Sequence, residues 1–221
     1  MLWMVLAAAP SLGGLVRMEA EVPPRPAVDM SADPACRSGR SERSFVLDDD
    51  RLANVFVWIE GAPAQPEDAP VELELVMEDC SFEPRVVGAR IGDRLWVRNE
   101  DRTLHVVHAE DFFHWVMPKG APPRSHRLEV ARVMVEIEDD VHPWMRSYLG
   151  VLPHRRFAVT DEHGRFTIDL KGLPAGRWII RFWHERLGPR SRSFEWSGET
   201  MQVELTYTFG REELVKPPPL Q

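Results

Sequence analysis

Asp139 is the residue whose place in the sequence most demands a chemical explanation. It ends a run in which Val133, Val135 and Ile137 occupy alternate positions. This alternation is typical of a strand with one buried face, so Asp139 is predicted to point inward at the strand's end. A buried carboxylate is costly unless it meets a cation, a metal ion or hydrogen-bond donors. We expect His105, on another strand, to be its partner, so a site is predicted here without reference to any family.

Other segments alternate in the same way and must form the framework that positions this site. Residues 55–59, 71–77 and 201–209 each place apolar side chains at every second position. The 19 prolines and 14 glycines are spread along the chain, as expected for short strands joined by turns. No long stretch repeats apolar residues at helical spacing. The predicted fold class is therefore all-β.

Composition limits the classes of function. The chain has 221 residues, 43% of them hydrophobic, which is enough for one large domain or two small ones with packed cores. Its net charge of −8 argues against nucleic-acid binding, which depends on clustered Lys and Arg. The short basic run from Arg186 to Arg192 is interpreted as a solvated loop. No segment approaches the roughly 20 apolar residues that a membrane span needs.

The order of the segments predicts two β-sandwiches. Residues 52–60 and the later stretches 157–168 and 172–180 resemble the carboxypeptidase regulatory-like, transthyretin-related β-sandwich, in which these pieces normally lie close together in sequence. Their separation here predicts that one sandwich is interrupted by a second domain, because an insertion at a loop tip costs little loop-closure entropy. The expected divisions are a leader-like segment 1–12, a discontinuous sandwich 13–69 and 153–210, an inserted domain 70–152 and a disordered tail 211–221.

The inserted stretch carries a series of motifs in a characteristic order. These are Phe82-Glu-Pro84, then Gly92-Asp93 before an apolar strand, then Asn99-Glu-Asp-Arg-Thr-Leu-His105, and finally Asp139-Asp-Val-His142-Pro-Trp-Met145. The series resembles the cupredoxin family, small copper proteins of the amicyanin and plastocyanin type with a Greek-key β-sandwich. At the last motif that family has Cys-x-x-His-Pro-Phe-Met, which supplies a thiolate, an imidazole and an axial thioether.

The resemblance implies a copper site. It makes His105 and His142 the imidazole ligands and Met145 the weak axial ligand, with Asp139 at the position of the family's cysteine. Two readings of this departure stay open: the set holds Cu(II) as a colourless, more tetragonal site, or it has become an Asp–His pair that holds the loop. Asn99, His108 and Trp144 are predicted to lie beside these ligands. His108 falls on the opposite strand face from His105, so the alternative for His108 is a position on the surface.

The two cysteines help to predict the cellular compartment of the protein. Cys36 and Cys80 make no C-x-x-C motif, and in an exported protein they are most simply one disulfide, the alternative being two buried free thiols. The apolar start, residues 1–9, resembles part of a signal peptide but is short and lacks a preceding Lys or Arg. These features predict a periplasmic or extracellular protein with an atypical leader.

Three classes of function are weighed on these residues. The first is an exported accessory that binds copper or transfers electrons, working with a redox or copper-donating partner protein. The second is a metal-free binding or structural module of an envelope complex, with carbohydrate contact through Trp58, Trp183 or Trp196 suggested by fold analogy alone. The third, an enzyme, is disfavoured because the chain shows neither a G-x-S-x-G nor an H-E-x-x-H motif.

Overall fold

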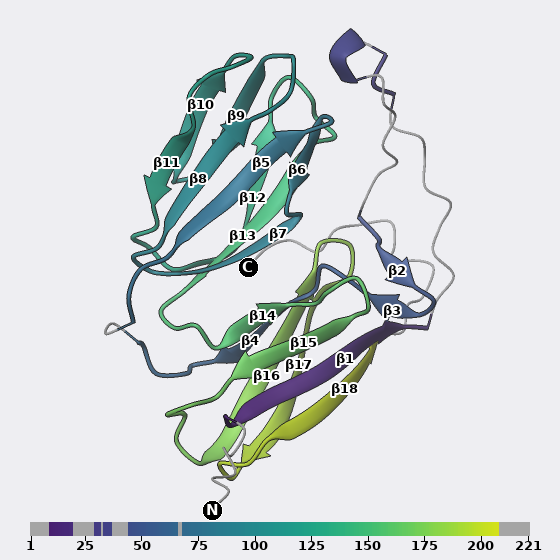
Figure 1. Cartoon of the computed structure of the whole chain (residues 1–221). Helices are drawn as coiled ribbons and strands as arrows, with labels where there is room; N and C mark the ends of the chain where they lie inside the picture. The colour runs from purple at the N-terminus through teal and green to yellow at the C-terminus, as the bar shows by residue number, and fades with distance from the viewer. Residues whose placement is uncertain (1–8, 20–28, 32, 37–43, 66–67, 208–221) are drawn as a thin grey trace, which may run out of the picture.

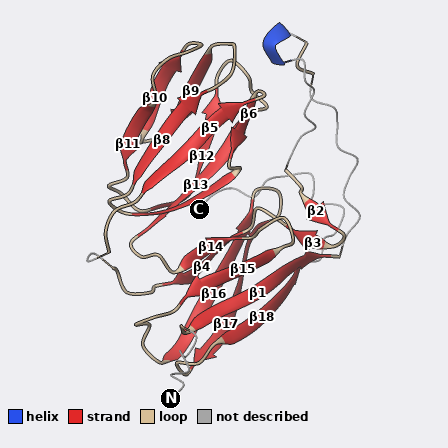
Figure 2. Ribbon diagram, in the orientation of Figure 1, coloured by secondary structure: helices blue, strands red, loops and turns tan. Residues whose placement is uncertain are grey.

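The computed structural model describes residues 9–19, 29–31, 33–36, 44–65 and 68–207. Figures 1 and 2 show that strands make up nearly all of the regular structure, with a single 3-10 turn, η1 (Pro34–Cys36), in the described part of the chain. The all-β fold class is confirmed. In the part that the structure describes, no helix is long and apolar enough to cross a membrane.

The first sandwich, which we call the host sandwich, is built from both ends of the chain. One sheet runs β15-β1-β3-β2 with β18 paired to β1, and the other runs β14-β4-β16-β17. The bounds of its strands are β1 (Ser11–Met18), β2 (Leu47–Asp48), β3 (Arg51–Leu52), β4 (Phe56–Glu60), β14 (Phe157–Val159), β15 (Arg165–Asp169), β16 (Gly176–His184), β17 (Gly188–Trp196) and β18 (Met201–Tyr207).

The second sandwich, which we call the insert sandwich, is continuous in sequence and lies between β4 and β14. Its sheets run β10-β9-β12-β13-β7 and β11-β8-β5-β6, with parallel pairs β13–β7 and β5–β8 among antiparallel ones. The bounds of its strands are β5 (Glu72–Glu78), β6 (Ser81–Glu83), β7 (Val86–Arg90), β8 (Arg94–Asn99), β9 (His105–Ala109), β10 (Phe113–Met117), β11 (Arg124–Arg127), β12 (Arg132–Asp139) and β13 (Arg146–Leu152).

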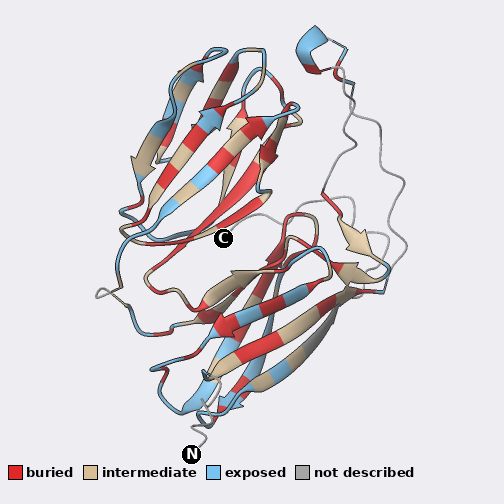
Figure 3. Cartoon of the chain, in the orientation of Figure 1, coloured by how far each residue is buried: buried red, intermediate tan, exposed pale blue. Residues whose placement is uncertain are grey.

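Each sandwich has its own core, and a third apolar cluster joins the two. Figure 3 shows that buried residues lie along the strands of both sandwiches. Phe56 of the host sandwich lies against Gly150 of the insert, where an added Cβ would come within 2.7 Å of the Phe56 ring. Glycine is needed there because the Phe56 ring and the Met134 side chain fill the space that a Cβ would occupy. Beside this cluster, Arg85 donates two hydrogen bonds to the Glu185 carboxylate, the shorter at 2.6 Å, across the two sandwiches. The insert is therefore packed onto the host rather than merely tethered to it.

Two expected boundaries need correction, and a third lies outside the described residues. Residues 1–8 lie outside the described residues, but Ser11 and Leu12, assigned to the leader, belong to β1, where Leu12 is fully buried. Residues 29–36 were assigned to the host sandwich, yet Met30 and Cys36 pack into the core of the insert. The tail 211–221 lies wholly outside the described residues, as do residues 208–210.

The strand before Asp139 departs from simple alternation. The register between β12 and β13 shifts between Arg132 and Val135, and Met134 has a φ of 59°. This bulge turns Val133 outward, so that it is 43% exposed instead of inward as predicted, and buries Met134 between the two sandwiches. Regular alternation resumes by Ile137, which is why Asp139 still points inward.

Candidate metal centre

Three elements bring the central residues together at one end of the insert sandwich. His105 is the first residue of β9, Asp139 is the last of β12, and His142 follows in the loop that leads to β13. Strands β9 and β12 are antiparallel neighbours in which Asp139 lies opposite Val107. His105 precedes Val107 by two positions, so the two side chains share the inward face of the sheet.

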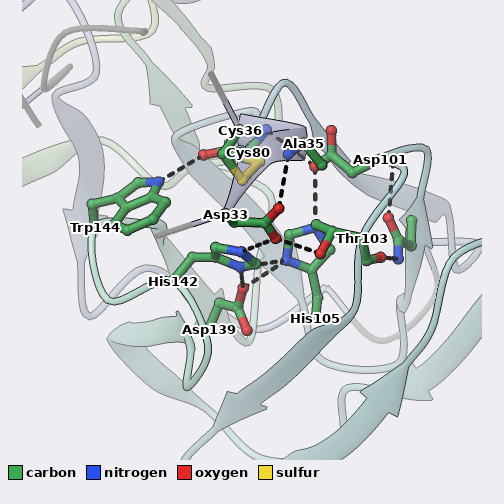
Figure 4. The surroundings of a disulfide bond; sticks show 11 residues. Asp33, Ala35, Cys36, Cys80, Asp101, Thr103, His105, Asp139, His142 and Trp144 are labelled. Carbon is green, nitrogen blue, oxygen red and sulfur yellow. Dashed lines mark hydrogen bonds and ion pairs between the residues drawn. A yellow bond between two sulfur atoms is a disulfide. The ribbon is translucent and has the colours of Figure 1, made fainter. Parts of the chain in front are cut away.

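Asp139 is the centre of the group (Figure 4). One of its oxygens, Oδ2, lies 2.6 Å from Nδ1 of His105 and 2.6 Å from Nδ1 of His142. Its other oxygen, Oδ1, accepts hydrogen bonds from the backbone N–H groups of Val106, at 2.8 Å, and Val141, at 3.2 Å. The side chains of Asp139, His105 and His142 are at most 1% exposed. The carboxylate is therefore withdrawn from water and satisfied at both oxygens.

Each histidine has a second carboxylate on its far side. Nε2 of His105 lies 3.1 Å from Oδ2 of Asp101, and Nε2 of His142 lies 3.1 Å from Oδ2 of Asp33. The result is a continuous chain, Asp101–His105–Asp139–His142–Asp33. An acceptor at Nε2 holds the proton on that nitrogen and turns Nδ1 toward the centre, which is the arrangement that orients histidine ligands of metals.

The charges in this row of five side chains favour a cation at its centre. Burial lowers the pKa of His105, but its hydrogen bonds to Asp101 and Asp139 and the charges of these two residues outweigh that effect and raise the pKa to about 9. Burial raises the pKa of Asp139, but hydrogen bonds from His105, His142 and the Val106 N–H bring it below its usual range. Three carboxylates thus surround two imidazoles. A divalent ion at the centre would compensate the negative charge of these carboxylates.

The donor set fits a borderline transition metal. His105, Asp139 and His142 each offer one ligand atom, and these atoms lie within 4.8 Å of one another. Two imidazole nitrogens and one carboxylate oxygen suit Cu²⁺ or Zn²⁺ better than a hard ion such as Mg²⁺. Copper would supply a redox-active, strongly bound cation at this point.

Asp33 reaches the site from a segment that we call the strap, residues 29–31 and 33–36. Oδ1 of Asp33 accepts the backbone N–H of Ala35 at 2.8 Å, and Oδ2 accepts the Thr103 hydroxyl at 2.5 Å. These two hydrogen bonds lower the pKa of Asp33 to about 2, and the bond from Thr103 has the larger effect. Asp33 therefore faces His142 as a carboxylate. The strap thereby covers the nitrogen of His142 that faces away from Asp139.

A disulfide holds the strap in place (Figure 4). Cys36 and Cys80 form a disulfide, and both are fully buried. The predicted bridge is therefore confirmed, and the alternative of two free thiols is wrong. The indole N–H of Trp144 donates to the Cys80 carbonyl oxygen at 3.2 Å, and the Trp144 ring lies edge-on to His142 with centroids 5.2 Å apart. Trp144 therefore lies beside His142 and packs against it.

Two other predicted residues take different roles. Asn99 donates hydrogen bonds to the carbonyl oxygens of Thr103 and Met117 and accepts the Asp101 N–H, so it fixes the loop that delivers Asp101 and His105. His108 does not lie beside the ligands: it faces the outside of the sheet and contacts Glu138 and Asp140. Of its two predicted positions, beside the ligands or on the surface, His108 takes the surface one, because residues 105 and 108 face opposite sides of the strand.

Met145 is 1% exposed in the core of the insert sandwich, and its backbone N–H donates to the His142 carbonyl oxygen at 2.8 Å. This bond tightens the loop that carries His142. Its role as an axial ligand stays a prediction.

Sequence reasoning missed the two outer carboxylates. Asp101 could have been found, because it precedes His105 by four residues in a tight loop. Asp33 carries no such signal, because it is 109 residues from His142 and meets it only through the folded strap.

No protein-family model matches the chain, and no curated protein matches it by sequence. Among solved structures it is similar to a Cu-containing nitrite reductase from Thermus scotoductus SA-01, with 18% identity and a TM-score of 0.33 over 38% of this chain and 23% of that one. It is similar to a mutant of amicyanin in the Cu(I) state, with 19% identity and a TM-score of 0.33 over 43% of this chain and 97% of that one. A third is a purple cupredoxin from Nitrosopumilus maritimus, with 15% identity and a TM-score of 0.32 over 36% and 98% of the two chains. The chain thus spans under a quarter of the reductase and nearly all of the two smaller proteins.

The raised pKa of His105 predicts a pH dependence for the metal-free protein. Protonated His105 stabilises the fold fully below the unfolded pKa of 6.5, and this stability is lost as pH rises through about 9. We expect the free energy of unfolding, measured by denaturant titration, to fall between pH 6.5 and pH 9 by more in the wild type than in His105→Gln. Burial and the Arg156 charge lower the pKa of His154 to about 4, so that group acts below this window. Equal slopes in the two proteins would contradict the assignment.

Proposed function

We propose that the protein is an exported copper-binding accessory that holds one Cu(II) ion between His105, Asp139 and His142. The observation that carries the proposal is the convergence of two buried Nδ1 atoms on one buried carboxylate oxygen, with each Nε2 held by a carboxylate of its own. Such a preformed set of ligands lowers the cost of organising the site when the ion arrives.

Copper is the favoured ion on two grounds. For a given set of nitrogen and oxygen ligands, affinity among the divalent first-row metals peaks at Cu²⁺. A thioether at Met145 would add a soft axial ligand, which suits copper more than zinc.

Copper handling is favoured over fast electron transfer. A blue-copper site depends on a cysteine thiolate, and position 139 is an aspartate. The strap also covers His142, which is only 1% exposed, so a redox partner has no direct contact with an imidazole edge. We infer that the protein stores the ion or passes it to a partner protein.

Binding is likewise favoured over catalysis. The candidate ligands are buried, and Asp33 and Trp144 occupy the space beside His142. A catalytic metal needs an open position for substrate or water. The arrangement is that of a closed binding site.

The disulfide supports export, because such bonds persist in oxidising compartments. In the metal-free alternative, the row of hydrogen-bonded residues from Asp101 to Asp33 is the same, but Asp139 only holds the loop and no ion is bound. Carbohydrate contact has less support: Trp183 and Trp196 are buried at 6% and 3% exposure, and the Trp196 indole N–H donates to the Leu173 carbonyl oxygen.

Titration of the metal-free protein with Cu(II) tests the proposal. We expect one tightly bound ion with an electron paramagnetic resonance signal split by two nitrogens, and loss of this ion in Asp139→Asn and in His142→Ala. A matched control is His163→Ala, which removes a surface histidine paired with Asp48 at 2.9 Å and leaves the buried site intact. A buried site that takes up no copper in the folded wild type would leave the metal-free alternative standing.

The strap generates a separate prediction. Asp33→Asn removes the charge that faces His142 Nε2 but keeps the shape of the side chain, so Cu(II) affinity should fall about 10–100-fold, the usual effect of losing an outer partner of a histidine ligand. The measurement is competition with a chelator of known affinity. Asp29→Asn is the control, because Asp29 is on the same strap and bonds only locally, to the Ser31 N–H, among the contacts described. Equal affinities of the two variants would show that the strap does not support the site.

A further inference from the structure

A second group of histidines and carboxylates lies on the outside of the sheet that holds the metal centre. We call it the outer cluster: His108, His114, Glu138 and Asp140. In the register of the sheet His114 of β10 lies opposite His108 of β9, and His108 lies opposite Glu138 of β12. Three neighbouring strands therefore place these side chains in one row, and Asp140 follows directly after β12.

Asp140 stands between the two imidazoles. Its Oδ1 lies 3.0 Å from Nδ1 of His108, and its Oδ2 lies 3.2 Å from Nε2 of His114. Nε2 of His108 lies 3.5 Å from Oε2 of Glu138, and the two imidazole centroids are 5.7 Å apart. The cluster thus repeats on the outside what Asp139 does on the inside, one aspartate meeting two histidines. The repetition follows from the strand, because consecutive residues face opposite sides of a sheet.

One atom of the cluster lacks the partner that its position requires. Nδ1 of His108 is shielded from solvent, yet it makes no hydrogen bond within the described residues, because the nearby Asp140 oxygen lies outside hydrogen-bond geometry. A shielded nitrogen of this kind is costly unless it binds something. A metal ion drawn to the Asp140 carboxylate would satisfy it.

The surroundings of the cluster suit a cation that arrives from solution. A hollow of about 1070 Å³ adjoins it, and the charged side chains that line the hollow are mostly acidic. These are Glu110, Asp111, Glu136, Glu138 and Asp140, with Arg132 as the basic exception. Arg146 engages Oε1 of Glu136 and Oε1 of Glu138, which leaves Oε2 of Glu138 directed at His108.

We propose that the outer cluster is a second metal site, which binds a borderline divalent ion, Cu²⁺ more tightly than Zn²⁺, through His108, His114 and Asp140. The side chains of His114 and Asp140 are 66% and 45% exposed, so they can turn until both ligate the same ion as His108. Water completes the coordination. The site shares no ligand with the buried centre and lies on the opposite face of the sheet, so it stands whether or not the buried centre binds copper.

Metal titration of the full chain tests this site. We expect the wild type to bind a second, weaker Cu(II) ion, and His114→Ala and Asp140→Asn each to lose it while retaining the buried ion. Both residues are exposed, so the melting temperature of the metal-free variants should match that of the wild type. With Zn²⁺, the imidazole nitrogen resonances of His108 and His114 should shift together.

The matched control is the double variant Asp48→Asn with His163→Ala, which removes a surface aspartate–histidine pair that has only one imidazole. It should leave the weaker ion in place. The proposal is overturned if His114→Ala retains the full number of bound ions, or if the control loses the weaker ion as well. Asp139→Asn separates this question from the buried centre, because that variant should still bind one ion that His114→Ala then removes.

Discussion

The structure around the metal centre depends on one constraint, the burial of the Asp139 carboxylate at the end of β12. A charge withdrawn from water must be compensated at both of its oxygens. Two backbone N–H groups compensate Oδ1, and the imidazoles of His105 and His142 compensate Oδ2. The loop after β12 contacts Asp139 at both oxygens, through the Val141 N–H and the His142 imidazole, so the carboxylate helps to fix the loop as well as the centre.

The same constraint extends outward through the histidines to the strap. Each imidazole that faces Asp139 directs its other nitrogen away from it, and that nitrogen needs an acceptor of its own. Asp101 supplies one from the loop before β9, and Asp33 supplies the other from a segment that precedes the insert sandwich in sequence. The Cys36–Cys80 disulfide is therefore tied to the centre: it anchors the strap that completes the surroundings of His142.

Much of this site could be predicted from sequence because its signals are local. The alternation of apolar residues before Asp139 was enough to predict that its side chain points inward. The spacing of His142 and Met145 indicated the loop that follows β12. The bulge at Met134 was not predictable from alternation, because the positive φ there is favoured by packing between the two sandwiches and not by the residue type. Asp33 was missed for a related reason: nothing near it in sequence reports on a contact made more than one hundred residues away. His108 was more tractable, because strand alternation alone places it on the face opposite His105, and the structure shows it there beside Glu138 and Asp140.

Visible absorption of Asp139→Cys loaded with Cu(II) tests most directly whether residue 139 occupies the ligand position between two imidazoles. A thiolate placed there beside His105 and His142 should produce the intense colour of a copper–thiolate bond, whereas the Cu(II)-loaded wild type should stay nearly colourless. A folded Asp139→Cys protein that binds Cu(II) without this colour, or binds none, would contradict the account.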